Sequence, residues 1–296
     1  RRPRCRPLCA VVGVHDRCAS MGACGSTSSP ASSPLPLDAK GARALQVVSM
    51  ESKMDMSMRF NSEKKTSSKP EGLPGIGFAC RRGRKPGTQT PNQDSWALYW
   101  EPDMISACGV FDGHGEKGHI VSDYVKQALM RKVLSLEHNE ADDVETSVEA
   151  CYQQVQRSLA SQPRLGTDMS GTTATVVVYD HGSERLMCSH VGDSAAVLLK
   201  QHPTSERFVA ERLTRDHKPN LPDEQERIER HGRVVFDGYC HRVMTKQSME
   251  PGLNMSRSLG DMRAHTLCGV SSTPEVLVRT VTRQDRAILV CSDGVW

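Results

Sequence analysis

Three acidic residues in this sequence stand where oxygen ligands for a metal ion are expected. Asp112, Asp193 and Asp293 each follow a short apolar run, and each has a glycine as a neighbour in the chain. Short apolar runs bounded by glycine are typical of buried strands, which places these carboxylates at strand ends. Glycine also lets a backbone carbonyl approach the same point. Because magnesium and manganese prefer such oxygen donors, the pattern predicts a divalent cation site and metal-assisted hydrolysis.

The same positions have a simpler explanation, because Asp-Gly is also a common turn dipeptide. His114 favours the metal interpretation. It lies two residues after Asp112 and between two glycines, so no neighbouring apolar side chain places it in a core. On these residues alone, both interpretations stay open.

The composition of the whole chain narrows the function classes. The 296 residues can form one large or two small domains, and a net charge of +3 indicates neither a nucleic-acid surface nor an acidic tail. The eleven cysteines contain no CxxC pair, which predicts reduced thiols in a cytoplasmic protein. No apolar stretch in the sequence is long enough to span a bilayer.

A lipidation pattern begins at Met21. The sequence MGACGS fits N-myristoylation if Gly22 becomes the N-terminus. Since the chain opens on arginine, we expect residues 1–20 to be upstream or non-native sequence; the alternative is that Met21 is internal and the match fortuitous.

One myristoyl chain holds a protein at a membrane only marginally, with a binding constant of about 10⁴ M⁻¹. Cys24 as a palmitoylation site and the lysines at 64, 65 and 69 would supply a second signal. We therefore expect a cytoplasmic protein at a membrane face, with residues 21–74 forming the lipidation motif and a disordered Ser/Pro/Met-rich arm.

The folded part is expected from about residue 75. Apolar residues recur at spacings of three and four after His114, and again after a cap at Asp142 or Asp143, which predicts two helices. Pro222 starts a third helix. Helices and strands come in blocks, which favours antiparallel sheets with helices packed outside. The predicted strands cover 93–100, 105–111, 173–179, 186–191 and 196–200, with another beginning at 234–235.

Nine short motifs are specific in combination, although each is weak alone. They are Asn92–Ser95, Val110–Gly115, Ser170–Ala174, Val191–Ser194, Leu213–Pro219, Glu226–Gly232, Met255–Asp261, Thr273–Val276 and Cys291–Trp296. In content and order this set resembles the metal-dependent serine/threonine protein phosphatases of type 2C. The resemblance implies an α+β fold, a four-layer αββα sandwich of two antiparallel β-sheets flanked by helices with its final elements missing, and a catalytic domain at 75–296.

Carried over residue by residue, the resemblance implies a centre of two Mg²⁺ or Mn²⁺ ions, with a weaker third ion. Asp112 would bridge both ions, Gly113 would offer its carbonyl to one, and Asp293 would ligate the other. Asp94 would hold metal-bound waters, and Asp193 would ligate the third ion. Two cations lower the pKa of a shared water and absorb the charge that develops on phosphorus.

His114 would be the general acid, because a departing serine or threonine alkoxide needs a proton that imidazole supplies near pH 7. The implied substrates are phosphoserine and phosphothreonine proteins, with no nucleic acid partner, and a monomer is expected. Structural roles are expected for Ser170–Ala174 as a strand entry and Asp216–Lys218 as a loop anchor. Ser256–Arg257 and Gly260–Asp261 either border the substrate groove or provide buried polar support.

Departures from the family pattern bear on activity. Gln93 stands where the family often has glutamate, and Ala195 where arginine is frequent. The phosphate-binding arginine has no clear counterpart; Arg84 or Lys85 is the candidate, and a solvated basic cluster is the alternative. The family's last metal-binding aspartate would follow Trp296, so we expect a C-terminally truncated piece whose activity needs that ligand.

Three other functions compete with this interpretation. A catalytically silent binding or regulatory module would keep the fold without turnover, and Gln93 favours it. A cysteine-based phosphatase is rejected because Cys151 and Arg157, which have the C-x5-R spacing, lie on a predicted helix without a phosphate-cradling loop. A serine hydrolase built on Ser194 lacks a histidine partner in motif context.

Overall fold

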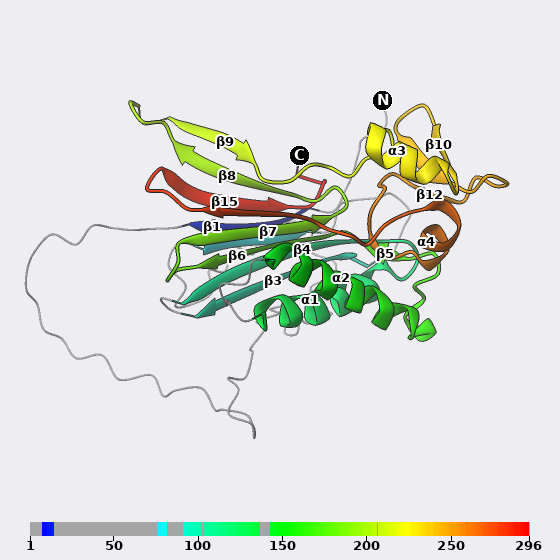
Figure 1. Cartoon of the computed structure of the whole chain (residues 1–296), viewed down its shortest axis with the longest axis horizontal. Coiled ribbons are helices and arrows are strands. Elements are labelled where there is room, and N and C mark those ends of the chain that lie inside the picture. Colours follow the sequence, from blue (N-terminus) through cyan, green and yellow to red (C-terminus); the bar gives the residue numbers. More distant parts are fainter. Residues whose placement is uncertain are drawn as a thin grey trace, which may run out of the picture.

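Two antiparallel β-sheets lie face to face in the computed structural model, and two long helices pack on the outer side of one sheet (Figure 1). The structure describes residues 8–14, 76–81, 91–101, 104–136, 143–205 and 207–295. The blocks of helix and strand predicted from the sequence thus form an α+β fold with antiparallel sheets.

The larger sheet has seven strands, in the order β13-β5-β4-β6-β7-β14 with β3 paired to β4. Its members confirm the strands predicted at 93–100, 105–111, 173–179 and 186–191. They are β3 (Asp94–Glu101), β4 (Ile105–His114), β5 (Gly171–Thr172), β6 (Ala174–Asp180), β7 (Arg185–Val191), β13 (Leu259–Gly260) and β14 (Glu275–Thr280).

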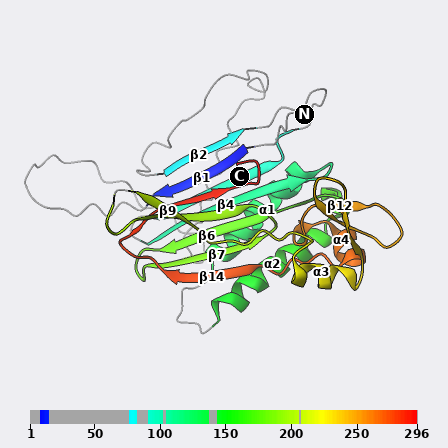
Figure 2. The ribbon, with the colours of Figure 1, turned by 90° about the horizontal axis from the view of Figure 1, so that it is seen from above.

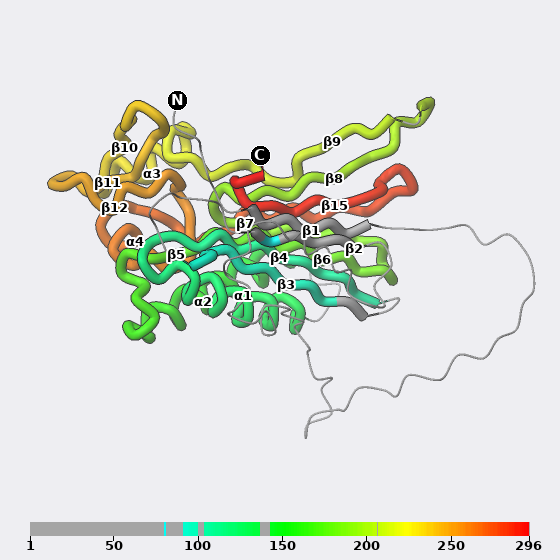
Figure 3. Tube along the Cα trace, turned by 180° about the vertical axis from the view of Figure 1, so that it is seen from behind, coloured from blue at the N-terminus to red at the C-terminus, as the bar shows by residue number. Residues whose placement is uncertain are grey.

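The smaller of the two sheets has five strands, in the order β2-β1-β15-β8-β9. β1 lies between β2 and β15 and pairs with both, although the sequence analysis assigns residues 1–20 to an extension. Figure 3 shows β8, β9 and β15 of this sheet from behind, above β4 and β6. The strands are β1 (Leu8–Val14), β2 (Ile76–Arg81), β8 (Ala195–Gln201), β9 (Phe208–Arg212) and β15 (Asp285–Cys291).

Two helices cover the outer face of the seven-stranded sheet, α1 (Gly118–Leu134) and α2 (Val144–Ala160). Both confirm the predicted helices, and the side chain of Asp143 caps α2 by accepting a hydrogen bond from Thr146 N at 2.8 Å. A 3-10 turn, η3 (Pro163–Leu165), follows α2. The buried stripe consists of Val121, Val125, Leu129, Val133, Val148, Cys151, Val155 and Leu159.

A second apolar core fills the space between the two sheets. Because side chains alternate along a strand, β4 directs Phe111 toward the helices and Val110 toward the other sheet. Among the described residues no helix covers the outer face of the five-stranded sheet (Figure 1). Three layers of the four-layer sandwich implied by the resemblance are therefore seen.

A small unit of two helices and three strands lies at one end of the sheets (Figure 2). Of these elements, α3 and the start of β10 are predicted from the sequence, and the others are not. No helix of the described residues has both the length and the apolar character needed to cross a membrane. The elements of the small unit are α3 (Pro222–Glu229), β10 (Arg233–Phe236), β11 (His241–Met244), β12 (Pro251–Leu253) and α4 (Met262–Cys268).

Candidate metal centre

Strand pairing brings two acidic residues directly opposite each other. Asp94 opens β3, Asp112 lies near the end of β4, and the two are register partners. Trp96 and Val110 are also partners on these strands, and both pack between the sheets. Alternation along the strands turns Asp94 and Asp112 toward the same side. Two carboxylates therefore face each other at the edge of the space between the sheets.

Two further carboxylates approach this pair from other strand ends. Asp193 lies in the turn between β7 and β8, where it pairs with the ammonium group of Lys218. Asp293 follows β15. Within the part of the chain that the structure describes, no three of these acidic residues hold their ligand oxygens within 4.8 Å of one another. In place of three converging carboxylates, the structure therefore has the opposed pair of Asp94 and Asp112, with Asp193 and Asp293 nearby.

The opposed pair is electrostatically unfavourable without a cation. Burial, followed by the Cys80 thiol and later by Asp293, raises the pKa of Asp94 to about 7, although hydrogen bonds to Ser292 and Asp112 act in the opposite direction. Burial, followed by Asp94, Asp293 and Asp193, holds the pKa of Asp112 well above its usual range. The Oδ1 atom of Asp94 is buried with no hydrogen-bond partner among the described residues. A hard cation would relieve the repulsion and satisfy this oxygen, so the donor set fits Mg²⁺ or Mn²⁺.

The backbone at the end of β4 is packed too closely for any side chain at position 113. A Cβ on Gly113 would lie 2.4 Å from Gly118 O and 2.5 Å from Gln93 O. Gly113 N donates to Gln93 O at 3.2 Å, and Gln93 Nε2 donates to Gly115 O at 2.5 Å. The amide that stands in place of the family's glutamate therefore holds the loop after β4.

His114 contacts an acidic residue that the sequence analysis did not assign to the metal site. Its Nε2 lies 2.7 Å from Asp261 Oδ2, which also accepts a hydrogen bond from Ser258 Oγ at 2.6 Å. Burial lowers the pKa of His114, but Asp261 and other nearby carboxylates raise it to a net value above the ordinary one. A Cβ on Gly171 would lie 2.1 Å from the Asp261 carboxylate. Asp261 is thus a buried partner of His114 and a further oxygen donor at this edge.

Asp261 lies far from the other acids in sequence, at a position with an unusual backbone. Its φ of 45° is in the left-handed region, which residues other than glycine rarely adopt. The sequence signal that bears on it is the match of Met255–Asp261 to the family. Spacing and periodicity do not predict its contact with His114, because that contact depends on the pairing of β13 with β5.

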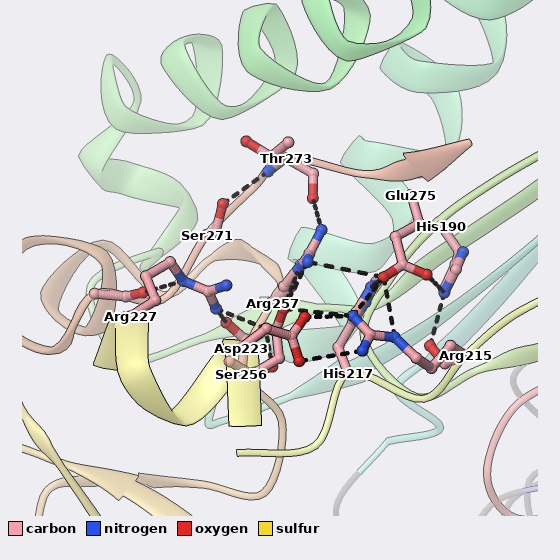
Figure 4. Close-up of polar contacts among 12 residues, drawn as sticks. His190, Arg215, His217, Asp223, Arg227, Ser256, Arg257, Ser271, Thr273 and Glu275 are labelled. Atoms are coloured by element: carbon pink, nitrogen blue, oxygen red, sulfur yellow. Dashed lines mark hydrogen bonds and ion pairs between the residues drawn. The ribbon is translucent and has the colours of Figure 1, made fainter. Parts of the chain in front are cut away.

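Ser256 and Arg257 provide buried support, one of the two roles that the sequence analysis allowed. Glu224 is fully buried and accepts hydrogen bonds from Arg227, Arg257 and Ser256. Burial would raise the pKa of Glu224, but these three donors lower it below its usual range. Figure 4 shows the three donors together with His217 and Glu275.

The structure does not describe four of the residues singled out from the sequence, which are Arg84, Lys85, Gly22 and Cys24. Cys151 and Arg157 both lie in α2, so the C-x5-R segment is helical and forms no phosphate-binding loop.

Comparison with known proteins identifies relatives over most of the chain. The family described as Protein phosphatase 2C matches residues 81–296. Probable protein phosphatase 2C 64 of Oryza sativa subsp. japonica is 35% identical over 222 residues, covering 71% of this chain and 51% of that protein. Probable protein phosphatase 2C 61 of Arabidopsis thaliana is 36% identical over 214 residues, covering 69% and 64%. The chain therefore spans about half to two thirds of the length of these relatives.

The fold has counterparts among solved structures. The serine-threonine phosphatase 2C from Toxoplasma gondii superposes with a TM-score of 0.58 at 22% identity, covering 70% of this chain and 75% of that chain. A sex determining protein of C. elegans superposes with a TM-score of 0.54 at 24% identity, covering 66% and 46%. At these identities the likeness concerns the fold alone.

We predict that Gly113→Ala destabilises the metal edge, by which we mean the strand ends and turns that carry Asp94, Asp112, Asp193, Asp261 and Asp293. The new methyl group would clash with backbone oxygens, which cannot move aside by a change of rotamer as a side chain can. The free energy of unfolding in urea should therefore fall by about 1–3 kcal/mol. Gly182→Ala is the matched control, because a Cβ there meets only Asp180 Oδ1, at 3.3 Å. Equal unfolding free energies for the two variants would contradict the close approach at position 113.

A second prediction concerns two stacked histidines beside this edge. The rings of His190 and His217 lie 4.5 Å apart, and His190 Nε2 donates to Arg215 O at 2.8 Å. Burial, followed by His217, lowers the pKa of His190 to about 4, with Arg257 acting in the same direction and Glu275 opposing it.

An unfolded histidine titrates near pH 6.5, so between pH 6.5 and pH 4 the unfolded chain binds this proton first. Stability should therefore fall as the pH falls through this window, by up to about 3 kcal/mol from this group. Urea unfolding of the wild type and His190→Asn at pH 7.5 and pH 4.5 measures the difference. The same pH dependence in both proteins would rule out this contribution from His190.

Proposed function

The chain belongs to the protein phosphatase 2C family, and on that premise we propose that the full-length protein hydrolyses phosphoserine and phosphothreonine in proteins with a metal-activated water. The observation that carries the proposal is the opposed, buried pair of Asp94 and Asp112. Such a pair has a clear chemical use when it binds divalent cations.

This family comprises metal-dependent phosphatases, and we propose two Mg²⁺ or Mn²⁺ ions as the cofactors. Asp112, the Gly113 carbonyl, Asp293 and Asp94 would hold them, and Asp193 would hold a third. When bound, such ions lower the pKa of a water molecule and stabilise negative charge on the phosphoryl group. Asp261 joins this donor set, because its carboxylate lies at the same edge beside His114.

The protein's own residues position the reacting groups. Asp94 and Asp112 are fixed by the register of β3 and β4, and the backbone of Asp112 is held on both sides by Thr173, through Thr173 Oγ1 at 3.0 Å and Thr173 N at 2.9 Å. Strand pairing fixes the backbone of each acid opposite that of the other. The site is therefore organised before any ligand arrives.

His114 supplies the proton for the leaving group in this proposal. The leaving alkoxide is a strong base, so transfer of a proton from a positioned imidazole lowers the barrier. Asp261 accepts the hydrogen bond from Nε2, and Ser258 fixes Asp261 in turn. This chain of contacts orients the ring and stabilises its protonated form.

A catalytically silent binding module is the second candidate, and one contact favours it. Gln93 stands where the family often has glutamate, and its amide nitrogen donates a hydrogen bond to Gly115 O. The two candidates differ in turnover on a phosphoserine peptide. An active full-length protein excludes the silent module.

We also propose the finer features expected from the sequence. The full-length protein would be a monomer with a fourth, helical layer on the five-stranded sheet. Myristoylation at Gly22 and palmitoylation at Cys24 would place it at the cytoplasmic face of a membrane. The MGACGS pattern supports the acylation, whereas the pairing of β1 with β2 and β15 counts against it, because a chain that begins at Gly22 lacks β1.

The metal mechanism predicts that EDTA abolishes hydrolysis of a phosphoserine peptide by the full-length protein, and that Mn²⁺ restores it. Asp112→Asn should lower kcat by at least about 100-fold, because it removes the charge that holds the ions. Asp168→Asn, at an exposed aspartate, should retain activity. Metal-independent turnover, or full activity of Asp112→Asn, would refute the mechanism.

Acylation predicts that cells expressing the protein from Met21 incorporate an alkynyl-myristate label and that Gly22→Ala does not. Cys24→Ser should retain the myristate label but shift the protein from the membrane fraction to the supernatant, since one acyl chain binds marginally. Absence of label from the wild type would exclude myristoylation.

A further inference from the structure

The turn that carries Asp193 is attached to a histidine through two hydrogen bonds. Gly192 N donates to His217 Nδ1 at 3.0 Å, and His217 N donates to Gly192 O at 3.0 Å. Gly192 has a φ of 96°, and a Cβ there would lie 2.6 Å from Thr173 Cγ2. The backbone immediately before Asp193 is therefore held by the Gly192–His217 pair on one side and packs against Thr173 on the other.

His217 is itself fixed within the protein. Its side chain is fully buried, its ring stacks on that of His190 with only 8° between the planes, and its carbonyl accepts from Ser256 N at 2.9 Å. Its Nε2 makes no hydrogen bond to any described residue and lies 3.5 Å from Glu275 Oε1. Figure 4 shows the ring among these neighbours. A ring held this firmly can fix the position of what it binds.

The donor atoms of His190, His217 and Glu275 lie within 4.8 Å of one another, which raises the question of a second metal site. Three observations speak against one. The rings are parallel, so their in-plane lone pairs do not converge. His190 Nε2 and His217 Nδ1 already bind backbone groups, and Arg215 donates to Glu275 at 2.7 Å. The cluster is a structural support.

We propose that His217 is a positioning residue for the metal edge, holding Asp193 at its place through the acceptor atom Nδ1. The inference rests on the proposed phosphatase function, because it assigns Asp193 to that metal centre. His217 touches neither substrate nor metal in this account. It acts through Gly192, the residue next to Asp193.

The same residue links Asp193 to the rest of the site. From His217 O the hydrogen bonds continue to Ser256 N, two residues before Ser258, which contacts Asp261. His217 thus lies between the segments that carry two of the candidate acids. A change in its acceptor atom should alter metal affinity more than it alters substrate recognition.

Two isosteric substitutions separate the two nitrogens of the ring. The Oδ1 atom of asparagine takes the place of Nδ1, so His217→Asn keeps the acceptor for Gly192 N. The amide of glutamine reaches the place of Nε2, so His217→Gln loses that acceptor and keeps a polar group near Glu275. His190→Ala removes the stacking ring and leaves the hydrogen bond to Gly192 intact, which makes it the control for packing loss.

The experiment measures Mn²⁺ binding to the full-length proteins by isothermal titration calorimetry, together with kcat and KM on a phosphoserine peptide at saturating and limiting Mn²⁺. Because Asp193 is assigned to the third ion, we expect His217→Gln to weaken the weakest Mn²⁺ binding step roughly 10- to 100-fold, the usual effect of losing a residue that orients a metal ligand, and to leave the tighter steps unchanged. His217→Asn should bind Mn²⁺ like the wild type. KM for peptide at saturating Mn²⁺ should stay unchanged in both.

A double-mutant cycle tests the route through Asp193. In an Asp193→Asn background, His217→Gln should produce no further loss of Mn²⁺ affinity, because the residue it positions is no longer a ligand. A full additional loss in that background would overturn the proposal.

Several other outcomes also test the proposal that His217 positions Asp193. Wild-type Mn²⁺ affinity in a folded His217→Gln, or weakening by His190→Ala equal to that of His217→Gln, would overturn the inference. If His217→Gln does not fold, His217→Asn decides, since weakened Mn²⁺ binding in that variant overturns the proposal and wild-type binding supports it. A wild type without Mn²⁺ uptake or turnover would instead refute the proposed function.

Discussion

The candidate site depends on two carboxylates that strand pairing forces to face each other. Like charges directly opposite on neighbouring strands destabilise a sheet, and burial increases the cost of each charge. Asp94 and Asp112 carry both penalties. The nearby ammonium group of Lys218 pairs with Asp193. The opposed pair is left either to share a proton or to bind a cation from solution, and both states follow from the register of β3 and β4.

The surrounding backbone preserves this unfavourable arrangement by keeping side chains out of it. Gly113 lets the end of β4, the residue before β3 and the start of α1 come together, and Gly171 leaves room for the Asp261 carboxylate. Thr173 holds Asp112 through backbone and hydroxyl groups at once. The apolar cores on both faces of the larger sheet prevent β4 from shifting to separate the acids. Packing free energy thus maintains the electrostatic repulsion that makes the edge a candidate site for cations.

Periodicity in the sequence predicts the parts of this structure that are stabilised locally. The apolar spacing of α1 and α2, the cap at Asp143 and the strands that lead to Asp112 and Asp193 all follow from residues close in the chain. The register that opposes Asp94 to Asp112 does not, because it is a property of two strands together. The contact between His114 and Asp261 spans a large part of the chain and needs the short β5–β13 pairing, too short to have a sequence pattern. The sequence predicts that Asp112, Asp193 and Asp293 converge. In the structure Asp193 forms an ion pair with Lys218.

The charges beside the metal edge are arranged to compensate one another. Glu224 is paired with Arg227 and Arg257, Glu275 with Arg215, and the two stacked histidines have lowered pKa values that keep them neutral near pH 7. A network that is balanced in this way adds little net charge to its neighbourhood, so it does not offset the repulsion between Asp94 and Asp112. His217 joins the two regions through hydrogen bonds of a neutral ring. It can therefore fix the position of the Asp193 turn without contributing a positive charge that would compete with a metal ion for the carboxylates.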